Sequence, residues 1–166
     1  MSELASNSRL CAHQTFDPNE KFSDYLRVDD LRKQNFEWAV TTLLHFCGFQ
    51  TERIGSQGFD PAPDILAFHP EKDMIIVGEC DTGVPDPTKI LNLQRRKERL
   101  EERMQGTVLA VLFSAADDDS LGGPSPDIRL VGWDTLEKMF LAASRGENVD
   151  AIWQILESSR GSIHSF

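Results

Sequence analysis

Residues 63–81 have the sequence PDILAFHPEKDMIIVGECD, and this stretch decides the fold. Ile65–Phe68 is a short apolar run, and Met74–Cys80 contains a second run, Met-Ile-Ile-Val. The five residues between the runs, HPEKD, are typical of a turn. We therefore expect an antiparallel hairpin. Its second strand should be central in a sheet, because its apolar residues can pack on both faces.

Three carboxylates gather at the open end of this hairpin. Asp64 precedes the first strand, and Glu79 and Asp81 end the second. Because side chains alternate along a strand, Glu79 and Asp81 share a face, while Cys80 points the other way as a buried structural thiol. Clustered carboxylates bind hard cations such as Mg²⁺ or Mn²⁺. The stretch therefore predicts a metal site formed by Asp64, Glu79 and Asp81.

The elements around the hairpin follow from apolar spacing and from turn residues. Apolar residues at three-to-four spacing predict a helix from about residue 31 to Gly48, and a short strand is expected at about 50–54. The remaining expectations are a loop at 55–61, a helix from about 86 to 105, a strand at 108–113, a loop at 115–126, a strand at 128–131, and helices at 133–144 and 149–158. This order predicts an α/β fold with a central mixed β-sheet flanked by helices.

The same order of elements resembles that of the PD-(D/E)XK nuclease superfamily, which has the restriction-endonuclease-like fold. The resemblance covers about residues 31–144. Glu37, in the segment Asn35–Val40 of the first helix, matches the family's helix acid, and Pro63-Asp64 matches its aspartate. The segment Glu79–Asp81 matches the acid-X-lysine motif only in part. The resemblance implies a metal-dependent nuclease, in which Glu37 orients water or a second metal.

Asp81 stands where the family has lysine, which reverses a charge next to an anionic substrate. Three explanations are open. The lysine has migrated, with Lys89 of the next helix as the candidate. Alternatively, Asp81 binds a further metal, or the domain has lost cleavage and kept another role.

Each candidate residue also has a plain structural interpretation. Asp64 can simply begin a strand, and Glu79 and Asp81 can be solvated charges at a strand end. Glu37 can pair on the helix surface with Lys33, four residues earlier. Lys89 can be an ordinary surface lysine.

The helix at 86–105 carries Arg95, Arg96 and Arg99 and could follow a nucleic-acid backbone. It also carries Glu98, Glu101 and Glu102, so a solvated mixed-charge helix is the favoured interpretation. The chain has 17 basic and 27 acidic residues, a net charge of −10, which argues against strong nucleic-acid binding without excluding it. The alternative function is a non-catalytic protein-interaction or sensing domain of a larger defence or regulatory system.

The chain of 166 residues suits one domain. Residues 1–26 are polar and irregular, so we expect an arm or linker there and the restriction-endonuclease-like domain at 27–166. Three widely spaced cysteines predict free thiols. No signal peptide and no membrane-spanning run are evident, so we expect a soluble cytoplasmic protein.

Overall fold

The computed structural model describes residues 33–54, 62–122 and 127–159. The expected arm at 1–26, the expected helix start near residue 31 and the expected loop at 55–61 lie outside these ranges. The elements are α3 (Lys33–Phe46), β1 (Gln50–Arg53), β2 (Ile65–Phe68), β3 (Met74–Asp81), α4 (Pro87–Arg103), β4 (Thr107–Ser114), a 3₁₀ helix (Asp118–Ser120), β5 (Arg129–Val131), α5 (Trp133–Ser144) and α6 (Val149–Glu157).

The strands form one mixed sheet in the order β1-β2-β3-β4-β5. β1, β2 and β3 are antiparallel neighbours, whereas β3, β4 and β5 are parallel. β2 and β3 form the predicted hairpin, with Ile65 opposite Gly78 and Phe68 opposite Ile75. β3 is the central strand, as its continuous apolar run predicted, and α4 connects it to β4 as a parallel crossover.

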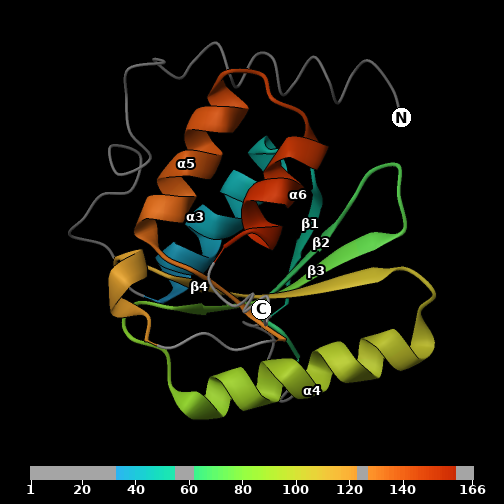
Figure 1. The fold of residues 1–166 in the computed structure, drawn as a ribbon, viewed down its shortest axis with the longest axis vertical. Helices are drawn as coiled ribbons and strands as arrows, with labels where there is room; N and C mark the ends of the chain where they lie inside the picture. Colours follow the sequence, from blue (N-terminus) through green and yellow to red (C-terminus); the bar gives the residue numbers. More distant parts are fainter. Residues whose placement is uncertain (1–32, 55–61, 123–126, 160–166) are drawn as a thin grey trace, which may run out of the picture.

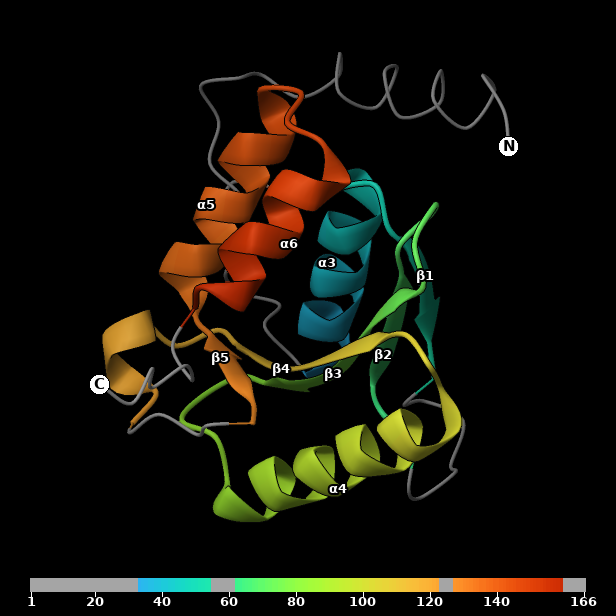
Figure 2. The same cartoon turned by 45° about the vertical axis from the view of Figure 1, so that its right-hand side comes forward.

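Helices cover both faces of the sheet. Helices α3, α5 and α6 lie together on one face, and α4 lies on the other (Figures 1 and 2). The strands accordingly divide their side chains between two apolar clusters. Ile76 and Cys80 of β3 belong to the cluster under α3, α5 and α6, whereas Ile75 and Val77 belong to the cluster under α4. Cys80 is fully buried, in agreement with the predicted structural thiol.

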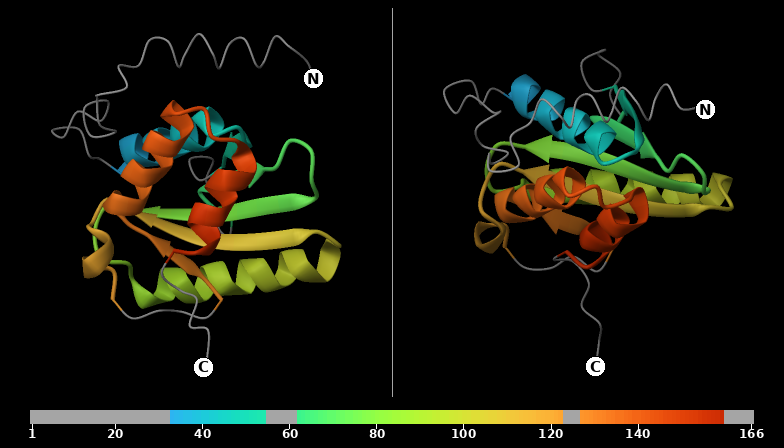
Figure 3. Two further views of the ribbon diagram at one scale, coloured as in Figure 1. Left: turned by 45° about the horizontal axis from the view of Figure 1, so that its top comes forward. Right: turned by 90° about the horizontal axis from the view of Figure 1, so that it is seen from above.

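The ends of the helices follow local chemistry. Helix α3 is followed by Gly48, whose φ of 108° lies in the left-handed region that favours glycine. Helix α4 begins after Asp86, whose carboxylate accepts the N–H of Thr88 at 2.8 Å, and Pro87 occupies its first turn. It runs along nearly the whole length of β3 and β4 (Figure 3). The placement of α4 therefore determines where its inward-facing side chains meet β3 and β4.

The hairpin turn is attached to α6 through a buried histidine. His69 Nδ1 accepts the backbone N–H groups of Glu71 and Lys72 at 3.1 and 3.0 Å. The ring therefore carries its proton on Nε2, which donates to Asp150 at 3.0 Å. This connection lies at the end of the hairpin opposite Asp64 and Glu79.

Two tryptophans of the described ranges differ in their burial. Trp153 is buried and packs against Phe49, with ring centroids 6.5 Å apart. Trp38 is 58% exposed and does not belong to the core. No helix in the described ranges is long and apolar enough to cross a membrane.

Candidate functional site

Asp64 and Glu79 lie side by side where β2 begins and β3 ends. Asp64 is one step beyond the Ile65–Gly78 pair, so the antiparallel register places it opposite Glu79. Both residues are buried, at 6% and 7% exposed. The Asp64 carboxylate accepts the backbone N–H of Cys80 at 2.9 Å, which fixes the side chain against β3. Two carboxylates that are this buried need hydrogen-bond or ionic partners, because an unpaired buried charge is unfavourable.

Glu79 has a cationic partner in Arg96 of α4. Its Oε1 forms an ion pair with a terminal nitrogen of Arg96, and the two side chains are only 9% and 15% exposed. Arg96 therefore does not belong to a solvated face. The favoured interpretation of this helix as a solvated mixed-charge helix is wrong at this position, because the side chain turns toward the sheet to compensate a buried acid.

Asp81 has a second partner on the same helix. Lys89 Nζ lies 3.2 Å from Asp81 Oδ2 and donates to the carbonyl oxygen of Cys80 at 3.1 Å. The two side chains are 29% and 22% exposed, so the pair lies at the rim of the site. The ammonium of Lys89 thus lies at the end of β3, beside the position at which the resembling family has its lysine.

Glu37 is buried as well, at 4% exposed, on α3. Its helix covers the sheet face opposite α4 (Figure 2). The Glu37 carbonyl accepts the hydroxyl of Thr41 at 2.7 Å. The interpretation of Glu37 as a solvated helix acid is therefore wrong, and its role toward water or metal stays a prediction.

Mg²⁺ and Mn²⁺ need oxygen ligands, which the site offers as carboxylates. Within the described ranges, no three His, Cys, Asp or Glu side chains form a group that could hold a metal ion. Mg²⁺ is usually bound through one or two carboxylates, with water and substrate phosphate completing the shell. Asp64 and Glu79 supply two carboxylates, so the type and number of protein ligands are suitable for Mg²⁺. The ligand roles of Asp64, Glu79 and Asp81 stay predictions.

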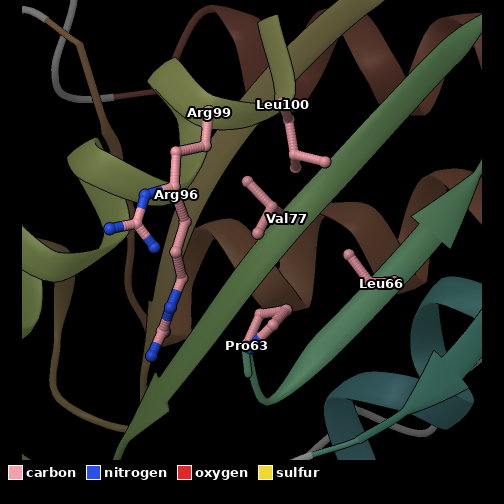
Figure 4. A pocket seen from close by; sticks show the side chains of 6 residues that line it. All are labelled: Pro63, Leu66, Val77, Arg96, Arg99 and Leu100. Atoms are coloured by element: carbon pink, nitrogen blue, oxygen red, sulfur yellow. The ribbon is translucent and has the colours of Figure 1, made fainter. Parts of the chain in front are cut away.

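A shallow pocket of about 210 Å³ adjoins this site on the α4 face. Pro63, Leu66, Val77 and Leu100 form an apolar floor, and Arg96 and Arg99 form its basic rim. In Figure 4 the Arg96 side chain extends along β3 past Pro63 toward the strand end, with the Arg99 guanidinium nearby. Two guanidinium groups beside an apolar floor are suited to a phosphate with a ribose or base attached.

The inward direction of Arg96 was not predicted from the sequence. The signal was in the apolar stripe of α4, which contains Leu93 and Leu100. Arg96 lies three residues after Leu93 and four before Leu100, so it shares their face. A charged residue within such a stripe predicts a buried partner. Lys89, four residues before Leu93, lies on the same side.

The buried thiols do not suit nucleophilic chemistry. Burial raises the pKa of the Cys47 thiol, which leaves it protonated at neutral pH. Its Sγ lies 4.0 Å from the carbonyl oxygen of Met139, in the core between α3 and α5. Neither Cys47 nor Cys80 forms a disulfide with a described residue. The acidic residues and the α4 cations are thus the site's reactive groups.

The architecture is that of a restriction-endonuclease-like α/β fold. The structure is similar to the small subunit of the heterodimeric restriction endonuclease R.BspD6I, with a TM-score of 0.51 and 14% identity over 74% of this chain and 76% of that chain. At this identity the likeness establishes the fold and no more. No protein-family model and no curated protein sequence matches the chain.

Proposed function

We propose that this domain is a divalent-metal-dependent phosphodiesterase acting on DNA or RNA, in which Lys89 replaces the lysine of the PD-(D/E)XK motif. The observation that carries the proposal is the position of the Lys89 ammonium, 3.1 Å from the Cys80 carbonyl at the end of β3. A lysine on the strand and a lysine on the following helix can deliver the same charge to the same place. In this proposal Asp81 is a local counter-ion for Lys89.

Each residue of the site has a distinct task in this proposal. Asp64 and Glu79 hold Mg²⁺ or Mn²⁺, and Asp81 keeps the ammonium of Lys89 in place or adds a ligand. When bound, the metal polarises a phosphoryl oxygen and activates a water. Lys89 stabilises the negative charge that develops on the phosphate. Helix α3 lies across the sheet from α4, so Glu37 would orient water or a second metal from the other face of the sheet.

The surface of α4 is the proposed contact with the nucleic-acid backbone. Arg95 and Arg99 are exposed on this helix, and Arg99 borders the apolar pocket. The net charge of −10 limits general attraction to nucleic acid, so we expect binding to depend on these arginines and to weaken with salt. Free Cys47 and Cys80 agree with a reducing compartment, and we propose a cytoplasmic location.

A cleavage assay tests the proposal directly. Single- and double-stranded DNA and RNA are incubated with Mg²⁺ or Mn²⁺ and the wild-type protein, Asp64→Asn, Glu79→Gln or the control Glu101→Gln. Glu101 is an exposed acid on the same helix as Arg96, and it pairs with Lys97 in an i,i+4 contact. We expect cleavage by the wild type and the control alone. Equal residual activity in all four proteins would contradict the proposal.

A second candidate is a non-catalytic domain that contacts another protein. Two observations favour it: the internal pairing of Glu79 with Arg96, which satisfies the acid without metal, and the 58% exposure of Trp38. The structural neighbour is itself one subunit of a heterodimer. A wild-type protein that cleaves no substrate with either metal would favour this candidate.

A further inference from the structure

The ion pair between Arg96 and Glu79 places a cation where a metal held by Glu79 would carry its charge. Both side chains are at least 85% buried, so water weakens this pair far less than a surface pair. A carboxylate has two oxygens, but a guanidinium and a divalent cation bound to the same carboxylate repel each other at short range. Metal binding by Glu79 therefore favours a state in which Arg96 has left Oε1.

Arg96 has a place to go when it leaves. It borders the pocket over Val77 and Leu100, with Arg99 on the same rim (Figure 4). The long side chain of arginine can rotate within this open space while its aliphatic stem stays on the apolar floor. Two guanidinium groups on one rim would repel each other unless an anion lies between them.

We propose that Arg96 and a divalent cation compete for Glu79, and that the displaced guanidinium joins Arg99 in binding a phosphate of the nucleic acid. This inference rests on the proposed metal role of Glu79. It makes the metal and the substrate bind with positive coupling, since each favours the state in which Arg96 has left Glu79. The coupling is reciprocal: the phosphate ligand raises metal affinity by the factor by which the metal raises its affinity.

Calorimetric titration with Mn²⁺ measures the competition without any cleavage. Arg96→Met removes the competitor and keeps the aliphatic stem. Arg103→Met removes the same charge from the exposed last turn of α4 as a control. We expect Arg96→Met to bind Mn²⁺ roughly tenfold or more tightly than wild type, because a hydrogen-bonded charged pair no longer has to break. The control should stay close to wild type.

The coupling is measured with a short DNA duplex that carries nuclease-resistant phosphorothioate linkages. In the wild-type protein this duplex should raise Mn²⁺ affinity, whereas in Arg96→Met it should not. Equal or weaker Mn²⁺ binding by Arg96→Met overturns the competition, and so does an absence of binding in both proteins. A duplex effect that persists in Arg96→Met overturns the phosphate role.

Arg96→Met leaves a buried carboxylate unpaired, so a measurement on the wild-type protein is also needed. The Nε–Hε resonance of Arg96, assigned by comparison with Arg96→Met or Arg96→Lys, is followed during titration with Mg²⁺. Competition predicts that it shifts in the wild type and stays unchanged in Glu79→Gln. Calorimetric Mg²⁺ binding with a stationary Arg96 resonance contradicts the inference.

Failure of this inference is distinct from failure of the proposed activity. If the wild type cleaves nucleic acid but Arg96→Met gains no Mn²⁺ affinity, the proposed activity is supported and the proposed competition is wrong. If Arg96→Met gains Mn²⁺ affinity but the wild type cleaves nothing, the competition is supported and the activity is wrong.

Discussion

Replacing Lys89 by methionine tests the origin of the site's positive charge most directly. The ammonium lies at the end of β3, 3.2 Å from Asp81 and 3.1 Å from the Cys80 carbonyl. Methionine keeps most of the unbranched stem and removes the ammonium, together with its hydrogen bond to the Cys80 carbonyl. The variant should therefore fold normally and lose the stabilisation that Lys89 gives to a phosphate bound at Asp64 and Glu79.

The size of the loss follows from the charge and its surroundings. For a phosphate charge at about 6 Å in an effective dielectric constant near 20, one positive charge contributes about 2.8 kcal/mol. That energy corresponds to roughly a hundredfold change in rate. Loss of one preorganised electrostatic group from an active site has effects of about 10²–10³-fold. We therefore expect Lys89→Met to lower kcat/KM about a hundredfold.

The decisive variant places the lysine back on the strand. Asp81→Lys in the Lys89→Met background restores the acid-X-lysine pattern with a single ammonium, and we expect it to recover most of the lost activity. Lys97→Met, which removes a charge elsewhere on α4, is the control and should cleave as the wild type does. Full activity of Lys89→Met would refute the migrated-lysine argument. Failure of Asp81→Lys to recover any activity would show that the strand position no longer reaches the phosphate.

Three further predictions concern stability. His69→Ala removes the buried acceptor of two turn N–H groups. It should lower the free energy of unfolding, measured by urea titration, by about 2–3 kcal/mol and leave cleavage unchanged. A loss as small as that of a surface substitution would contradict the assigned hydrogen bonds. Hydrogen bonds from Lys72 and then His69 lower the pKa of Asp150 below the ordinary value of an aspartate, so this acid stabilises the fold above that ordinary pKa and loses its contribution as the pH falls through the lowered pKa. An NMR titration of Asp150 that gives a midpoint at or above the ordinary value would contradict this assignment. Ile76→Ala, at a fully buried position of β3, should lower the free energy of unfolding by about 3 kcal/mol, measured in the same way, and a loss under 1 kcal/mol would imply that the core refills the cavity.

The hairpin and the central strand were predictable because their signals are local. The apolar run of Met74–Cys80 and the polar turn before it predicted the strand, its antiparallel neighbour and its burial on both faces. The helix at α4 was predictable from the Asp86-Pro87 start, and its expected end at Gln105 is two residues later than the observed end at Arg103. That difference is small, because helix ends are decided by capping contacts rather than by periodicity.

The site was only partly predictable, because its compensation is long-range. The predicted hairpin placed Asp64 and Glu79 at the same end of the sheet, and the observed register sets them opposite each other. The pairing of Glu79 with Arg96 spans 17 residues and depends on how α4 lies across the sheet. No local pattern specifies that angle. Only the place of Arg96 within the apolar stripe hinted that one of several arginines points inward.

The two cations of the site belong to a single helix, seven residues apart, which is almost two full turns. A residue inserted between Lys89 and Arg96 would rotate one relative to the other by about 100° and separate them. The length of the segment 82–86, which joins β3 to α4, is constrained for the same reason. Ser114 Oγ holds this segment by donating a hydrogen bond to the Gly83 carbonyl at 2.6 Å. Relatives that retain this chemistry should therefore conserve the number of residues from Glu79 to Arg96, while the connection after β4 is free to vary in length. Among such relatives the diagnostic trait would be this spacing rather than a sequence motif.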